Sequence, residues 1–191
     1  MTVEKKEFQS NADIENLKAT MERYFDRLWP ICRSIMGHGF RESLNILSEI
    51  MPMEQMIFAS GEKVLDWIVP DEWVIRDAYF IDPNGKKRAD FKKNNLHVVG
   101  YSEPFSGSLS LAELKDHLHS IPDYPDLIPY LTTYYARYWG FCLAHEELNS
   151  LPNSKYEVKI DSEFRHGNLV VGESIDQGRD RSVPDVQPRR G

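Results

Sequence analysis

Residues 134–148, YYARYWGFCLAHEEL, place a cysteine three residues before a histidine. A thiol and an imidazole can act as nucleophile and general base, and His-Glu can open the H-E-x-x-H helix that binds zinc. The zinc motif fails because Asn149 occupies the position of its second histidine. Cys142 stands between Phe141 and Leu143, which favours a buried and unreactive thiol. A small hydrolase built on Cys142 and His145 is therefore the least favoured alternative.

The other histidines do not form a metal site by their spacing. His117 and His119 are two residues apart in a segment that we expect to be helical, so their side chains diverge. His97 lies between apolar residues of an expected strand, which favours a histidine held by packing and one hydrogen bond. His38 and His166 occupy glycine-containing turns far apart in the sequence. They could share a metal only if folding brought them together beside a carboxylate such as Glu42 or Glu173.

Residue types and spacing thus predict no catalytic, cofactor-binding or metal-binding residues in this chain. Five residues are weak candidates for binding: Asp66, Trp67, Arg76, His97 and Trp139. The two charged ones lie near expected strands, where they can line a pocket or pair with other charges at the surface. The tryptophans, together with Trp73, can present exposed aromatic surface to a peptide, a saccharide or a protein.

The elements that position these residues change in type along the chain. A helix is expected from residues 11–13 to Trp29, because apolar residues recur every three or four positions up to Leu28. Pro30 disfavours helical geometry in the residue before it and so ends this helix. A second helix over residues 40–50 follows the glycines of MGHGF. Each helix has one apolar face.

Short β-rich runs follow between residues 55 and 101. Within them Asp82-Pro83-Asn84-Gly85 is the expected turn of a hairpin, since Gly85 or Asn84 adopts a positive φ with little strain. Residues 108–121 return to helical spacing, with Ser110 and Glu113 in a capping-box arrangement. Residues 130–148 are expected to be helical in part, and residues 155–164 and 168–174 to form a last pair of strands. The fold class is α+β.

Charge and cysteine content argue against several classes of protein. The net charge of -7 and the pI near 5.4 oppose nucleic-acid binding, which requires many basic residues to neutralise phosphates. The chain has two cysteines, no signal-peptide pattern and no run of eighteen apolar residues, so we expect reduced thiols, a cytoplasmic location and no membrane contact. Residues 1–10 and 176–191 offer little to bury and are expected to be disordered.

Several long phrases resemble a known family. They include LWPICRSIMGHGFRESLNIL, DWIVPDEW, FKKNNLHVVGYS and WGFC, within a match over residues 24–173. The chain resembles the N-terminal part of a bacterial aminopeptidase-like family found in polysaccharide-biosynthesis clusters. That family is related to zinc aminopeptidases of the aminopeptidase S type.

The resemblance implies an interrupted architecture. Residues 11–60 would be the N-terminal helical part of an α/β/α zinc-peptidase domain, residues 61–158 an inserted β-rich domain, and residues 159–175 the strands that return to the peptidase sheet. The peptidase domain would be incomplete in this chain.

The resemblance also implies a function. Zinc is expected for a full-length family member, with its ligands after the return strands, whereas here the chain passes into IDQGRDRSVPDVQPRRG and ends. We therefore expect a truncated, inactive fragment of an aminopeptidase-like protein that binds no zinc itself. The family substrate is an unknown peptide or saccharide-linked molecule. The alternative is a stand-alone binding module for a peptide, saccharide or protein, and the exposed N-terminal helices can support self-association.

Overall fold

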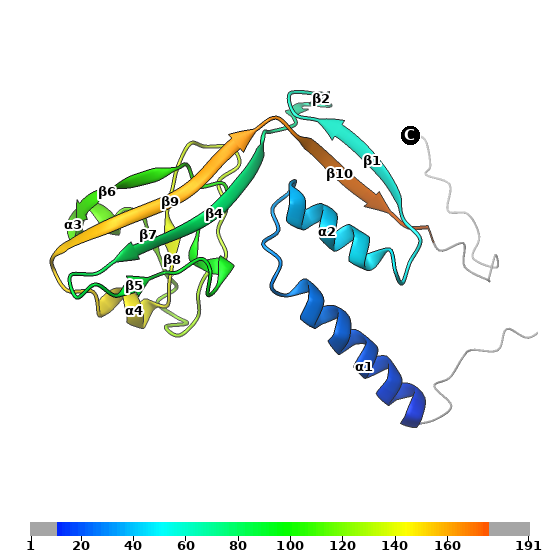
Figure 1. The fold of residues 1–191 in the computed structure, drawn as a ribbon, viewed down its shortest axis with the longest axis horizontal. Coiled ribbons are helices and arrows are strands. Elements are labelled where there is room, and N and C mark those ends of the chain that lie inside the picture. Colours follow the sequence, from blue (N-terminus) through cyan, green and yellow to red (C-terminus); the bar gives the residue numbers. More distant parts are fainter. Residues whose placement is uncertain (1–10, 176–191) are drawn as a thin grey trace, which may run out of the picture.

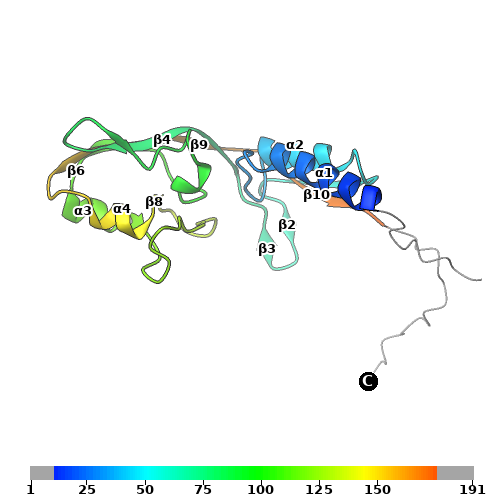
Figure 2. The ribbon, with the colours of Figure 1, turned by 90° about the horizontal axis from the view of Figure 1, so that it is seen from below.

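The computed structural model describes residues 11–175 and is α+β, as expected. Its elements form two parts that lie end to end (Figure 1). The first part contains α1 (Asn11–Leu28), α2 (His38–Leu47), β1 (Glu54–Ala59) and β10 (Asn168–Glu173). The short hairpin of β2 (Lys63–Val64) and β3 (Trp67–Ile68) projects from the region where the two parts meet (Figure 2).

The second part contains the remaining elements around one sheet. They are β4 (Glu72–Ile81), β5 (Lys87–Arg88), η1 (Asn95–His97), β6 (Phe105–Ser110), α3 (Leu111–Lys115), β7 (Leu118–His119), β8 (Phe141–Cys142), α4 (His145–Asn149) and β9 (Lys155–Arg165). The four-stranded sheet has the order β5-β4-β9-β6 and all its pairs are antiparallel. Its ladder begins where Glu72 lies opposite Arg165. The chain therefore enters and leaves the sheet at the same end.

The core of the second part lies between this sheet and the long connections that cover one face. Phe80 packs edge-on against Phe141 and Tyr156, with ring centroids 5.4 and 5.7 Å apart. All three side chains are buried. The connections are irregular over most of residues 120–144, so it is these aromatic contacts that hold them to the sheet.

In the first part, β1 and β10 pair as a two-stranded antiparallel ribbon, and α2 packs against β10. The contact is close at Gly172, where an added Cβ would lie 2.8 Å from Cδ2 of Leu44. Arg27 of α1 donates two hydrogen bonds of 2.6 Å to Glu49 and so connects α1 to the segment after α2. The helices and the ribbon thus form one small layered unit.

Most of the apolar face of α1 is exposed in the part of the chain that the structure describes, residues 11–175. Tyr24 is buried, but Ile14, Leu17, Met21 and Phe25 are exposed along one side of the helix. The sequence led us to expect exposed N-terminal helices that support self-association. The face of α2 packs on β10, whereas that of α1 stays open.

Several local predictions are confirmed. The first helix ends before Pro30, at Leu28 and so one residue short of the expected Trp29. The turn at residues 82–86 joins β4 to β5 with Gly85 at φ 77°. Ser110 and Glu113 form the predicted capping box at α3, and Asn168–Glu173 is a strand.

Three local predictions are wrong. The second helix is His38–Leu47, so it begins before residue 40, and Ile50 lies beyond it. Helical structure after Ser110 is confined to Leu111–Lys115, because the chain then turns into β7. His119 therefore lies on a strand. His97 lies on a 3-10 turn rather than on a strand.

Two of the predictions are not tested by the structure. The expected disorder of residues 1–10 and 176–191 lies outside the described residues. The division at residues 61–158 and 159–175 stays a prediction, although β9 runs without interruption across residue 159. Within residues 11–175 no helix combines the length and the apolar character needed to cross a lipid bilayer.

Candidate functional site

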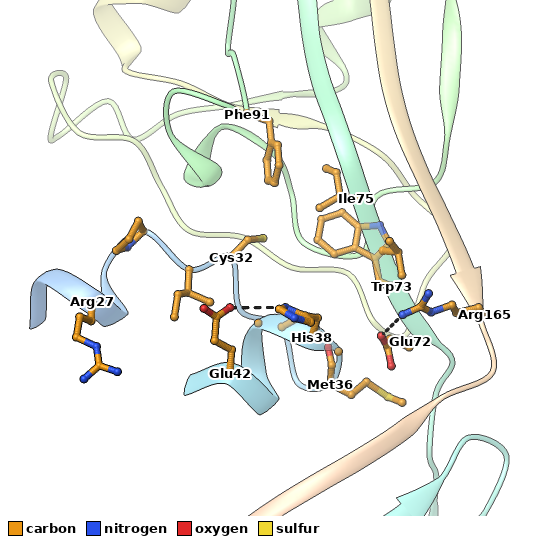
Figure 3. A pocket seen from close by; sticks show the side chains of 16 residues that line it. Arg27, Cys32, Met36, His38, Glu42, Glu72, Trp73, Ile75, Phe91 and Arg165 are labelled. Atoms are coloured by element: carbon orange, nitrogen blue, oxygen red, sulfur yellow. Dashed lines mark hydrogen bonds and ion pairs between the residues drawn. The ribbon is translucent and has the colours of Figure 1, made fainter. Parts of the chain in front are cut away.

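A cavity of about 450 Å³ lies where the two parts of the molecule meet, and we call it the junction cavity (Figure 3). One wall comes from the end of α1 and the loop that leads into α2, and the other from β4, Phe91 and the end of β9. The lining residues are Arg27, Pro30, Ile31, Cys32, Ser34, Met36, Gly37, His38, Gly39, Glu42, Glu72, Trp73, Val74, Ile75, Phe91 and Arg165.

Glu72 is the most deeply buried charged residue that lines this cavity, and only 3% of its surface is exposed. Arg41 of α2 donates to both of its carboxylate oxygens, at 3.0 and 3.2 Å, and Arg165 donates to Oε1 at 2.8 Å. Burial alone raises the pKa of this carboxyl, but the hydrogen bonds and charges of the two arginines outweigh burial and leave the pKa below its usual value. Glu72 is therefore an ionised, fully engaged structural group.

The surroundings of Glu72 leave little room for change. An added Cβ on Gly167 would lie 2.6 Å from Oε2 of Glu72, so a residue without a side chain is required there. Gly167 also accepts from and donates to the hydroxyl of Ser60, at 3.1 and 2.9 Å. The start of β4, the end of β9, α2 and the end of β1 are thus joined at one place.

The rim of the cavity carries an exposed histidine–carboxylate pair. Nδ1 of His38 lies 3.6 Å from Oε2 of Glu42, one turn further along α2 (Figure 3). Gly37 precedes them at φ 116°, a conformation that favours glycine, and this turn directs the start of α2 toward the cavity. The pair offers a hydrogen-bonding group and a negative charge to a ligand.

The inner wall is apolar. Ile31, Ile75 and Phe91 line it beside the half-buried Cys32. Burial raises the pKa of the Cys32 thiol, and the nearby charge of Arg33 offsets this only in part. Because the thiolate is the nucleophilic form, this wall is suited to contact with an apolar group rather than to covalent chemistry.

The five residues proposed from the sequence do not come together. None of them lines the junction cavity. Asp66 and Trp67 lie on the β2–β3 hairpin. Arg76 lies on the exposed face of the sheet, where it forms ion pairs with Asp161 and Glu163 at 2.9 Å each. Nδ1 of His97 is hydrogen-bonded to the carbonyl of Cys142 at 2.9 Å, the kind of single contact expected for a packed histidine.

Trp139 has a packing role in the structure. It is stacked between Phe105 and His117, at centroid distances of 4.3 and 3.6 Å. Trp73 is buried and donates to the carbonyl of Ser102, so the exposure that we expected of it is wrong. Neither aromatic ring forms an open platform for a ligand.

The structure does not favour a nucleophile–base pair at Cys142 and His145. Cys142 is fully buried, as expected, and burial raises the pKa of its thiol to about 12. His145 is bonded through Nδ1 to the hydroxyl of Ser120 at 2.9 Å. At neutral pH the thiol stays protonated, so a Cys/His hydrolase is not supported.

The side chains of positions 11–175 do not form a cluster of ligands that could hold a zinc ion. Nowhere in that range do three or more histidine, cysteine, aspartate or glutamate side chains lie close enough together to hold a metal. His38 does meet Glu42, but no third ligand joins them. A catalytic zinc needs about three protein ligands.

The sequence named His38 and Glu42 as possible neighbours, but it did not reveal the buried group of Glu72, Arg41 and Arg165. The spacing of His38 and Glu42, one helical turn apart after a glycine, could have revealed their pairing. Arg41 is 31 residues from Glu72 along the chain, and Arg165 is 93 residues from it. Glu72 meets Arg165 because β4 pairs with β9. No pattern within either segment of the sequence predicts that pairing.

Comparisons with known proteins agree with the sequence resemblance. Residues 72–163 match the family described as a domain of unknown function, DUF2172. The chain is 47% identical over 153 residues to the Clostridium acetobutylicum protein named "Putative polysaccharide biosynthesis protein with aminopeptidase-like domain", a match that covers 80% of this chain and 35% of the relative.

A solved structure gives the same result. The crystal structure of a "putative peptidase" from Clostridium acetobutylicum matches with a TM-score of 0.76 and 45% identity, over 85% of this chain and 39% of that one. The chain thus spans little more than a third of the length of the relatives it matches. It is thus a relative of a bacterial protein named for its aminopeptidase-like domain and of a putative peptidase, and its residues 72–163 match the DUF2172 domain.

Proposed function

We propose that residues 11–175 form the ligand-holding, non-catalytic part of an aminopeptidase-like protein, and that the junction cavity holds the ligand. The proposal rests on the junction cavity, which has an apolar wall and an exposed pair, His38 and Glu42, at its rim. The buried Glu72 and its two arginines hold the walls of the cavity in place. Glu72 is occupied by two arginines, so Glu42 is the carboxylate that remains accessible to a ligand.

This arrangement suits the amino-terminal end of a peptide. An apolar side chain would lie against Ile31, Ile75 and Phe91, and the ammonium group would lie near the carboxylate of Glu42. Peptidase chemistry, and the zinc that the family resemblance implies, would come from residues other than 11–175. The inactivity of this chain by itself is part of the proposal.

The test has two measurements on the purified chain. Elemental analysis and an aminopeptidase assay after zinc addition should give no stoichiometric zinc and no release of amino acids. Titration with a short peptide that has a free amino terminus and an apolar first residue should give binding that Glu42→Gln weakens about tenfold, while Glu146→Gln, on α4, leaves it unchanged.

Two results would contradict the proposal. One tightly held zinc per chain with measurable amino-acid release would show that this chain is catalytic. Equal peptide binding by the Glu42→Gln variant and the unchanged protein would show that the junction cavity is not the binding site.

A second proposal rests on a separate observation, the open apolar face of α1. We propose that two copies of this chain associate through Ile14, Leu17, Met21 and Phe25, because monomers seldom leave so continuous an apolar stripe uncovered. Met21→Glu should shift the chain toward monomer in sedimentation, and Glu22→Gln should not. A chain that is monomeric at all concentrations would disprove the self-association.

A further inference from the structure

A second, larger cavity adjoins the junction cavity, and we call it the basic groove. It has a volume of about 680 Å³ and lies between residues 29–33 and residues 91–96, with Tyr130 at its border. The two cavities share a wall made of Pro30, Ile31, Cys32 and Phe91. The groove opens on the other side of that wall and has a different chemistry.

The basic groove is positively charged although the chain as a whole carries -7. Arg33, Lys92 and Lys93 line it, and none of its lining residues is acidic. Lys92 lies 3.5 Å from Asp77 and Arg33 donates to the carbonyl of Leu28 at 2.7 Å. Among residues 11–175 neither Arg33 nor Lys93 forms an ion pair within 4.0 Å. Their charge is therefore available to an anion.

The groove also offers flat aromatic surface and one free amide NH₂ group, that of Asn94, because the NH₂ of Asn95 donates to the carbonyl of Pro30 at 3.5 Å. Trp29 and Tyr130 are each 63% exposed, so their ring faces are accessible to a ligand. Trp29 is held by stacking on Phe25 at 5.5 Å. Asn94 uses its amide oxygen to accept from the backbone of Leu96, so its NH₂ group is left to bind another molecule.

These groups together match one kind of ligand. Exposed aromatic faces stack on the C–H face of a sugar ring, amide groups bond to hydroxyls, and unpaired cations attract a negative group. An extended polyanion is opposed by the net charge of the chain, but a single anionic group in the groove is not. We propose that the basic groove binds an anionic sugar, a pyranose ring that bears a carboxylate or a phosphate. The proposal does not depend on the role of the junction cavity.

The test is calorimetric titration of the purified chain at low salt with four probes: D-glucuronate, D-glucose 6-phosphate, D-glucose and inorganic phosphate. At least one anionic sugar should bind about tenfold more tightly than both glucose and phosphate. Comparison of the two anionic sugars identifies the preferred negative group. Raising the salt concentration from about 0.05 to about 0.5 M should weaken this binding several-fold.

Matched variants locate the site. Trp29→Ala and Lys93→Ala should each weaken binding at least about fivefold, whereas Tyr135→Ala and Lys115→Ala, exposed and outside the groove, should leave it unchanged. Unfolding midpoints establish that each variant is folded. The proposal is overturned if no probe binds, if glucose or phosphate binds as tightly as the anionic sugars, or if the groove variants match the controls.

Discussion

Replacement of Glu72 by glutamine should destabilise the chain strongly. The glutamine keeps the shape of the side chain, but its NH₂ group then faces the N–H groups of Arg41 or Arg165, and the negative charge between the two guanidinium groups is lost. Removing one member of a buried ion pair costs about 3–5 kcal/mol. Because Arg41 and Arg165 are 36% and 52% exposed and regain water, we expect about 2–4 kcal/mol. Denaturant titration followed by tryptophan fluorescence measures this loss.

The matched control is Glu163→Gln, which removes a carboxylate whose partner Arg76 is half exposed. Its unfolding midpoint should equal that of the unchanged protein within error. If Glu72→Gln behaves like this control, the three hydrogen bonds to Glu72 do not stabilise the junction and the reasoning is refuted.

The pH dependence gives a second check on Glu72. Its pKa is lower in the folded state than in the unfolded state, so the folded state binds fewer protons. The stabilisation is complete above the unfolded-state pKa of about 4.3 and is lost as the pH falls through the folded-state pKa. The difference in unfolding free energy between the unchanged protein and Glu72→Gln should therefore be constant near neutral pH and shrink in acid.

Three further predictions concern single positions. Cys142 should react with iodoacetamide only on unfolding, as followed by mass spectrometry, and rapid labelling of the folded chain would contradict this. Cys142→Ser should lower the free energy of unfolding by about 1 kcal/mol or more. Gly167→Ala should lower the unfolding midpoint because its Cβ meets Glu72, while Gly107→Ala, with contacts no closer than 3.4 Å, should not. Ser110→Ala should lower the free energy of unfolding by about 1 kcal/mol because the N-cap hydrogen bond of α3 is lost. An unchanged denaturation midpoint would disprove this prediction.

Local chemistry in the sequence predicted the elements whose signals lie within a few residues. The helix that ends before Pro30, the turn at Gly85 and the capping box at Ser110 all depend on contacts between near neighbours. The buried state of Cys142 followed from its apolar neighbours in the same way.

The errors arise where distant segments override local preference. Residues 116–119 have helical spacing, but pairing of β7 with β8 replaces the helix because the buried sheet contact outweighs propensity. The candidate binding residues failed to gather for a related reason. The cavities depend on how residues 29–42 meet β4 and β9, and no periodicity in the sequence encodes that contact.

The meeting of Glu72 and Arg165 at the open end of the β4–β9 ladder has a mechanical consequence. A force that separates the first part of the molecule from the sheet acts on both strands at this same end. The hydrogen bonds between β4 and β9 would then break one residue pair at a time from this end. They would not all bear the force together, as they do when two strands are pulled from opposite ends. The three hydrogen bonds on Glu72 stand at the first pair to open, so they set the force at which the unzipping begins.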